Sequence, residues 1–129
     1  MGRERFYSGG RFEKLAAYSR ATRVGNRIVV SGTAAIDENG AVIGPGDAYA
    51  QTQAALVIAL QAVEALGGSR EQIVFTRLYL VPDSDWRGCV RAHQEAFDGV
   101  DPANTTLYVS GLIPEGALVE VELEADVTA

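Results

Sequence analysis

A stretch near the end of the chain alternates between apolar and acidic residues. From residue 119 to residue 126, apolar side chains occupy the odd positions and acids occupy Glu120, Glu122, Glu124 and Asp126. Because successive side chains of a β-strand point to opposite faces, this pattern predicts a strand with one face in the core and one face of carboxylates. Neighbours on one face lie about 6.7 Å apart, so the acids repel one another unless cations or solvent lie opposite.

Two interpretations of these acids compete. Glu124 and Asp126 fit a sheet face that is simply in water. Glu120 and Glu122 could be solvent-facing in the same way, or they could have a functional role. A carboxylate that is fixed on a rigid sheet and partly desolvated can hold a water molecule or a proton. The residues opposite Glu120 therefore decide what the strand does.

Length and charge limit the class of protein. The chain has 129 residues, which predicts a single domain over residues 1–129. Its net charge of −6, with no cluster of five or more Lys and Arg, argues against general nucleic-acid binding and against binding to an anionic membrane surface.

No stretch approaches the roughly 20 apolar residues of a membrane span, and no secretory signal is recognisable at the start. We expect a cytoplasmic protein.

The first half of the chain predicts strands and then a long helix. Residues 1–16 have no clear period and are expected to be irregular. Strands are predicted at 18–24 and 27–33, joined by a tight turn at Gly25-Asn26 because both residues tolerate positive φ. A second small hairpin or loop is expected around residues 41–43.

Two helices are predicted to pack on the sheet. Residues 47–66 begin with an aspartate suited to N-capping and are followed by Gly67-Gly68 as a stop. A second helix is expected over 85–97, capped by Asp83 or Ser84. The apolar stripes of the two helices comprise Leu56, Ala59, Leu60, Val63 and Leu66 in the first and Trp86, Cys89, Val90, His93 and Phe97 in the second.

The remaining strands complete an α+β domain with both helices on one face of a mixed sheet. Strands are predicted at 73–81, 105–109 and 118–126. In the first of these, Ile73, Phe75, Arg77, Tyr79 and Val81 share the face turned away from the helices. This face is too apolar to leave in water, so the pattern predicts that self-association buries it.

Outside the acidic strand, few ionisable residues are candidates for a functional role. Arg77 lies in mid-strand between aromatics, where a guanidinium needs a carboxylate or a ligand to meet it, so Arg77 either neutralises the acidic strand or reaches a ligand. His93 lies on an apolar stripe and is expected to be packed and hydrogen bonded, and Cys89 to be a small buried hydrophobe. With one His and one Cys, a protein-built zinc site is not expected, and we predict chemistry without metal or cofactor.

The candidates for chemistry are polar residues on strands and at strand ends. They are Tyr18, Ser19, Arg20, Ser31, Arg77, Asn104, Thr106, Glu120 and Glu122. Their chemical types alone do not assemble them into one site.

Over nearly its whole length the chain resembles the reactive-intermediate deaminase (RidA, YjgF-type) family. Tyr18-Ser19-Arg20-Ala21, Val24-Gly25-Asn26 and Val30-Ser31-Gly32 resemble the first hairpin of the family. Residues 51–56 resemble the start of its long helix, and Pro102-Ala103 with residues 118–122 resembles its C-terminal signature. The resemblance implies a chorismate-mutase-like α+β fold, a homotrimer with ligand clefts between subunits, and hydrolysis of enamines or imines to a carbonyl compound and ammonia.

The resemblance also implies roles for particular residues. A tyrosine that lines the cleft matches Tyr18, the Ser-Gly pair matches Ser31 and Gly32, and a glutamate that helps to place the attacking water matches Glu120. We expect Glu120 to act as a general base through that water, with Tyr18 or Asn104 hydrogen bonding the substrate.

Two positions depart from the family pattern. Asn104 stands where relatives carry the arginine that binds the substrate carboxylate, and Thr106 where many carry a cysteine. The charge-assisted hydrogen bonds from an arginine to a carboxylate contribute on the order of 2 to 3 kcal/mol, and the uncharged Asn cannot reproduce them. Two explanations are open: either Arg77 or Arg20 takes the place of the missing arginine, or the ligand lacks a carboxylate.

The expected function is therefore an enamine or imine deaminase whose substrate differs from 2-aminoacrylate. The alternative is a non-catalytic trimer that binds a small molecule or a protein partner in the same cleft. Ribonuclease or translation-inhibitor activity, sometimes attached to this family, is disfavoured by the acidic balance and by the lack of a basic stripe.

Overall fold

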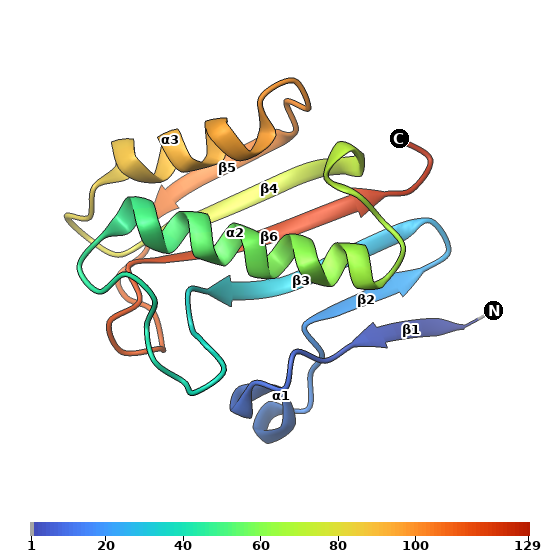
Figure 1. Cartoon of the computed structure of the whole chain (residues 1–129), viewed down its shortest axis with the longest axis horizontal. Helices are drawn as coiled ribbons and strands as arrows, with labels where there is room; N and C mark the ends of the chain where they lie inside the picture. The colour runs from blue at the N-terminus through green and yellow to red at the C-terminus, as the bar shows by residue number, and fades with distance from the viewer. Residues whose placement is uncertain (1) are drawn as a thin grey trace.

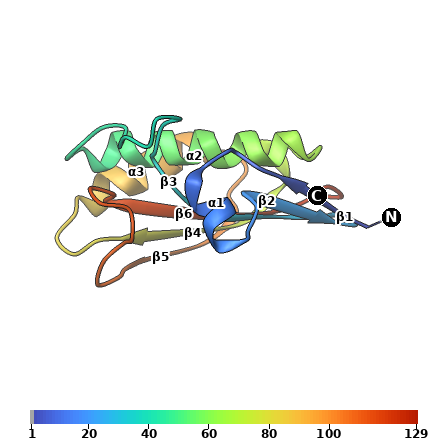
Figure 2. The ribbon, with the colours of Figure 1, turned by 90° about the horizontal axis from the view of Figure 1, so that it is seen from below.

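A computed structural model describes residues 2–129 and consists of a mixed six-stranded sheet with two helices on one face (Figures 1 and 2). The sheet order is β1-β2-β3-β6-β4-β5, and β4 and β5 are the parallel pair. The strands are β1 (Arg3–Phe6), β2 (Ala21–Val24), β3 (Arg27–Ala34), β4 (Ile73–Leu80), β5 (Ala103–Tyr108) and β6 (Val119–Asp126). The helices are α1 (Arg11–Ala16), α2 (Ala48–Ala65) and α3 (Trp86–Phe97), with a 3₁₀ turn at Arg70–Gln72. The predicted α+β class is confirmed.

The acidic strand β6 lies in the interior of the sheet, between β3 and β4. Its apolar residues are buried on the side that α2 covers, and its four acids are half-buried on the other side, which we call the open face. The strand alternation read from the sequence is confirmed. Since β6 pairs on both edges, its carboxylates are held on rigid backbone.

The long helix α2 follows the prediction closely. Asp47 is its N-cap and accepts a hydrogen bond from the backbone N–H of Ala50 at 3.0 Å. Gly67, with φ of +89°, ends it in a conformation that favours glycine. The predicted stripe packs on β3 and β6, so α2 forms one wall of the core.

The cap of α3 differs from the prediction. Asp85 is the N-cap and accepts from the N–H of Gly88 at 3.1 Å, so the choice of Asp83 or Ser84 is wrong. Asp83 adopts a positive φ of 63°, and the Ser84 hydroxyl donates instead to the Val81 carbonyl. Both residues belong to the turn that precedes the helix.

The predicted stripe of α3 is wrong at two positions. Trp86 and Val90 are exposed, whereas Cys89 and Phe97 are buried as expected. Trp86 and Val90 are four residues apart and share a helix face that is turned to solvent, while Cys89 contacts the Ala48 carbonyl of α2. Only a narrow stripe of α3 therefore enters the core. No helix within residues 2–129 has both the length and the apolar character needed to cross a bilayer.

The N-terminal segment is more ordered than predicted. Residues 3–6 form β1, which pairs antiparallel with β2, and residues 11–16 form α1, so the expectation of an irregular segment is wrong for both. Met1 lies outside the described residues. A four-residue strand and a six-residue helix are too short to show a clear period, which is why the sequence pattern missed them. The predicted strand at 18–24 begins at Ala21, because the chain turns through residues 17–20.

A β-bulge changes which residues of β4 face the core. The pairing register with β6 shifts between Ile73 and Phe75, so Ile73 is only 3% exposed and Val74 is 42% exposed. The predicted assignment of these two residues is wrong, whereas Thr76, Leu78 and Leu80 are buried as predicted. The open face of β4 thus carries Phe75, Arg77 and Tyr79. The predicted turn at Gly25-Asn26 and the small hairpin, bridged by Ile36 and Val42, are confirmed.

Candidate functional site

Glu120 projects from β6 onto the open face and packs over the backbone of Gly32. A Cβ atom added to Gly32 would overlap Oε1 of Glu120 and lie 3.0 Å from its Cδ. Within residues 2–129 no group donates a hydrogen bond to this half-buried carboxylate. Burial raises the pKa of the Glu120 carboxyl, the nearby Arg20 opposes that change, and the neighbouring Glu122 adds to it. Glu120 is therefore a partly desolvated carboxylate with free acceptor positions.

Arg20 fixes the backbone beneath Glu120. Its Nη1 donates to the Gly32 carbonyl at 2.6 Å and to Oγ1 of Thr33 at 3.2 Å. Its Nε and Nη2 donate to Oε2 of Glu13, at 3.4 and 3.3 Å. Glu13 is 3% exposed and also accepts from the backbone N–H and the hydroxyl of Ser8. The Arg20 guanidinium is thus engaged by protein groups and joins α1 to β3.

Tyr18 and Ser31 lie beside this guanidinium. The Tyr18 ring centroid is 5.6 Å from Cζ of Arg20, within the range of a cation–π contact. The Ser31 hydroxyl donates to the Ser19 carbonyl at 2.8 Å, and the Ser31 N–H donates to the Arg20 carbonyl at 2.8 Å. The structure therefore gathers five of the predicted site residues, which we call the Glu120 cluster: Tyr18, Arg20, Ser31, Gly32 and Glu120.

Arg77 lies on the same open face but meets the next acid along β6. Its Nη1 is 3.7 Å from Oε1 of Glu122, and its Cζ is 4.3 Å from the centre of the Phe75 ring. The Tyr79 hydroxyl donates to the same Glu122 oxygen at 2.5 Å, and this bond raises the pKa of Tyr79. Of the two roles predicted for Arg77, these contacts match the neutralisation of the acidic strand.

Asn104 and Thr106 lie on the helix side of the sheet. Nδ2 of Asn104 donates to Oγ1 of Thr76 at 2.9 Å, and Oγ1 of Thr106 donates to Oδ1 of Asn104 at 2.9 Å. In β4, Thr76 precedes Arg77, so their side chains point to opposite faces. Within one chain, Asn104 and Thr106 therefore do not meet Glu120.

His93 completes the polar chain that begins at Thr106. Its Nε2 is 2.7 Å from Oγ1 of Thr76, and its ring packs at 4.9 Å from that of Phe97. Burial lowers the pKa of His93, which favours the neutral ring. His93 is packed and hydrogen bonded, as the sequence predicted. No group of three or more His, Cys, Asp or Glu in residues 2–129 is arranged to hold a metal ion.

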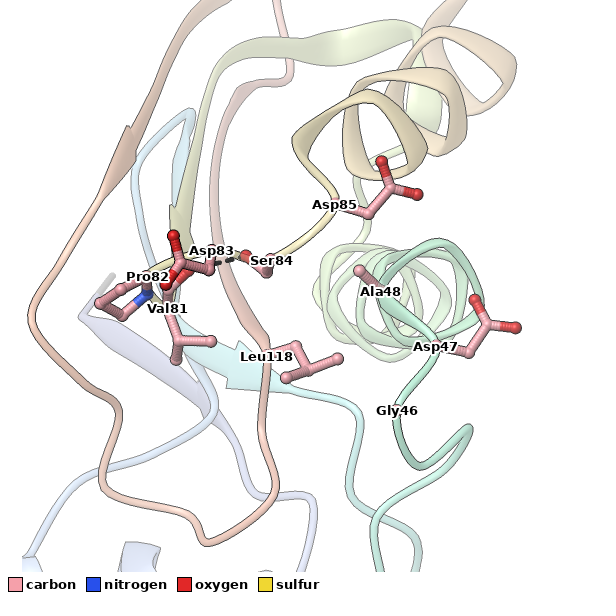
Figure 3. A pocket seen from close by; sticks show the side chains of 9 residues that line it. All are labelled: Gly46, Asp47, Ala48, Val81, Pro82, Asp83, Ser84, Asp85 and Leu118. Carbon is pink, nitrogen blue, oxygen red and sulfur yellow. Dashed lines mark hydrogen bonds between the residues drawn. The ribbon is translucent and has the colours of Figure 1, made fainter.

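One hollow lies away from every predicted site residue. It measures about 530 Å³ and opens between the N-terminal ends of α2 and α3 (Figure 3). Its acids Asp47, Asp83 and Asp85 lie on different sides of the hollow and do not converge, as Figure 3 shows. Asp47 and Asp85 are both engaged as helix caps, so neither is free to act as a general base.

The second hollow, of about 490 Å³, adjoins the Glu120 cluster. Tyr18, Ser19 and Ser31 line it, together with cationic residues from β1 and α1. The sequence analysis missed these cations, which are Arg3, Arg5 and Lys14, and it also missed the buried Glu13. The available signal was the period-two spacing of Arg3 and Arg5, which is typical of one face of a strand.

Comparisons with known proteins agree with this architecture. The family model described as Endoribonuclease L-PSP matches residues 9–127. The chain is 34% identical over 113 residues to the 3-aminoacrylate deaminase RutC of Acinetobacter baylyi, covering 88% of this chain and 89% of that protein. It is 38% identical over 121 residues to an uncharacterized protein of Streptomyces coelicolor, covering 94% and 90% of the two chains.

A solved structure from Mycobacterium tuberculosis shows the same fold. That protein, described as a member of the highly conserved YjgF/YER057c/UK114 family, has a TM-score of 0.87 and 35% identity, and the match covers 98% of this chain and all of the other. A structure from Yersinia pestis, described as belonging to the conserved Rid protein family, has a TM-score of 0.80 at 24% identity, over 98% of this chain and 100% of the other. The family predicted from the sequence is confirmed: the chain belongs to the Endoribonuclease L-PSP family, the RidA or YjgF-type proteins.

Proposed function

We propose that this protein hydrolyses an enamine or imine to a carbonyl compound and ammonia, with Glu120 as the general base. The observation that carries the proposal is the Glu120 carboxylate itself, half-buried over Gly32 and without a hydrogen-bond donor in residues 2–129. Burial moves its pKa upward, toward the range in which a carboxylate exchanges protons with water efficiently. A relative that shares 34% identity is named for deamination of 3-aminoacrylate, an enamine.

The proposed reaction uses one water molecule. The imine enters as its protonated form, the iminium. Glu120 takes a proton from this water as the oxygen attacks the C=N carbon, which gives a carbinolamine. The protonated Glu120 then gives that proton to the nitrogen. The C–N bond breaks, the hydroxyl proton passes to Glu120 as the C=O bond forms, and ammonia leaves and carries this proton away as ammonium. An enamine first gains a proton at carbon to become the iminium. Tyr18 is assigned to hydrogen bond the substrate.

The proposed active unit is a homotrimer with ligand clefts between subunits. Two observations support it. Asn104 and Thr106 lie on the opposite side of the sheet from Glu120, so a second copy is needed to bring both groups to one cleft. The open face also carries Phe75 and Tyr79, with the 40% exposed Leu107 beside them, and such a face favours burial by another copy.

The proposed substrate differs from 2-aminoacrylate. Asn104 carries no charge, and both ends of its amide are hydrogen bonded within the chain, to Thr76 and Thr106. Asn104 therefore cannot make the two charge-assisted hydrogen bonds that an arginine would donate to a carboxylate. The same observation favours a second candidate, a non-catalytic trimer that binds a small molecule or a protein in this cleft.

Ammonia release separates the two candidates. Wild type and Glu120→Ala are compared on a panel of freshly generated imines and enamines that includes 2-aminoacrylate and 3-aminoacrylate. The enzyme proposal predicts that at least one compound is turned over faster by the wild type than by the variant. Equal rates for the two proteins on every compound would remove Glu120 from any mechanism and leave the binding module.

A further inference from the structure

The N-terminal strand and helix bring positive charge to the hollow beside Tyr18. Arg3 and Arg5 are two residues apart on β1, so their side chains share one face of the strand. Lys14 reaches the same hollow from the last turn of α1. The three cations therefore line one space of about 490 Å³.

These cations are not neutralised by the protein. Within residues 2–129, Arg3, Arg5 and Lys14 take part in no ion pair. The one acid that lines the hollow, Glu13, is bound by Arg20 and by Ser8. The hollow thus keeps an excess of positive charge in a chain whose net charge is −6. Such a space favours an anion.

The hollow shares two of its lining residues with the Glu120 cluster. Tyr18, Ser19 and Ser31 line it, and Ser31 directly precedes Gly32, over which the Glu120 carboxylate packs. Among the cations, Arg5 is placed nearer to this cluster than Arg3. Arg5 precedes Phe6, whose carbonyl accepts from the N–H of Arg20 at 2.8 Å, whereas Arg3 pairs with Val24 next to the β2–β3 turn.

We propose that this hollow is the subsite for the carboxylate of the substrate, with Arg5 as its main contact and Arg3 and Lys14 adding charge. The inference rests on the proposed function, and it names the residues of this chain that hold the charged end of the substrate. A guanidinium binds a carboxylate through two parallel N–H···O bonds, which suits Arg5 to this role. The carboxylate would thus be held from the Tyr18 side, and Asn104 would not need to supply a charge.

Binding of a short carboxylate probe tests the subsite without turnover. Pyruvate carries a carboxylate next to a carbonyl group, and pyruvamide is its uncharged counterpart. Calorimetric titration is carried out on wild type, Arg5→Gln and the control Arg27→Gln, which removes an exposed arginine outside the hollow. We expect wild type to bind pyruvate at least tenfold more tightly than pyruvamide. Arg5→Gln should remove that preference, and Arg27→Gln should keep it.

The outcomes separate the subsite from the reaction. An equal Kd of wild type and Arg5→Gln for pyruvate, or no binding of pyruvate by either, would overturn the subsite. If the pyruvate preference depends on Arg5 but no imine is hydrolysed in a Glu120-dependent way, the subsite stands and the proposed reaction fails. If turnover depends on Glu120 while Arg5→Gln changes neither Kd nor KM, the reaction stands and the subsite fails. Thermal melts confirm that both variants are folded.

Discussion

The carboxylate of Glu120 occupies the space that a side chain at Gly32 would need. The φ of Gly32 is not in the left-handed region, so the reason for glycine here is steric. We expect Gly32→Ala to displace the carboxylate while leaving the fold intact, because the end of a glutamate side chain can move. Activity should fall by about tenfold or more, since a shift of roughly 1 Å costs up to 10²-fold in rate.

Stability distinguishes this displacement from general damage. The free energy of unfolding of Gly32→Ala, measured by denaturant titration, should lie within about 1 kcal/mol of the wild-type value. Unchanged ammonia release in this variant would mean that the carboxylate position over Gly32 is not the one used in the reaction.

Glu120 should reduce stability at neutral pH. Its pKa is raised in the folded protein, so the folded state holds a proton that the unfolded state releases above about pH 4.3. The contribution of Glu120 is therefore most favourable at low pH and is lost as pH rises through the folded pKa. We expect Glu120→Gln to have a higher Tm than wild type at pH 7, and this gap to shrink as pH falls toward 4. A gap that is constant across this range would contradict the raised pKa.

The buried pair of Arg20 and Glu13 should contribute strongly to stability. Their side chains are 11% and 3% exposed, so Glu13→Gln leaves the Arg20 charge without its counterion in a buried site. We expect a loss of about 3 kcal/mol in the free energy of unfolding. The pair of Arg27 and Glu124 provides the control. The Arg27 side chain is 66% exposed and solvent screens its charge, so Glu124→Gln should cost less than about 1 kcal/mol. Similar losses in the two variants would show that Arg20 is not held as the hydrogen bonds indicate.

The open face should be the surface through which copies associate. Leu107 lies on this face, whereas Val57 is an exposed residue of the outward surface of α2. A charge at residue 107 would be buried in the proposed trimer at high cost, so Leu107→Arg should reduce the mass measured by light scattering from three chains toward one. Val57→Arg should leave the mass unchanged. A wild-type protein of one chain would exclude the shared cleft.

The sequence predicted those elements whose periodicity extends over several turns or residue pairs. The alternation of β6 and the apolar stripe of α2 are long, and both were predicted with nearly the correct ends. The segments β1 and α1 are four and six residues long, so no period emerges from them. The bulge in β4 could not be predicted either. One extra residue exchanges the faces to which Ile73 and Val74 point, and no residue type in this segment signals it.

The candidate site was only partly predictable, because part of it lies on the short N-terminal elements and part depends on strand register. Tyr18, Ser31, Gly32 and Glu120 were identified by resemblance, and the structure brings them together around Arg20. The cations of the adjoining hollow were missed, since their segment was taken as irregular. The side of the sheet on which Asn104 lies depends on its register with Thr76, and only the structure supplies that register.

The most direct test of the central proposal is the pH dependence of kcat/KM for an imine that the wild type hydrolyses. If Glu120 is the general base, the rate should fall on the acidic side with an apparent pKa above the ordinary glutamate value of about 4.3, because only the ionised carboxylate can accept the proton. Glu124→Gln, on the same strand, should keep that acidic limb, and Glu120→Gln should lose both the limb and most of the rate. An acidic limb that persists unchanged in Glu120→Gln would contradict the role of Glu120.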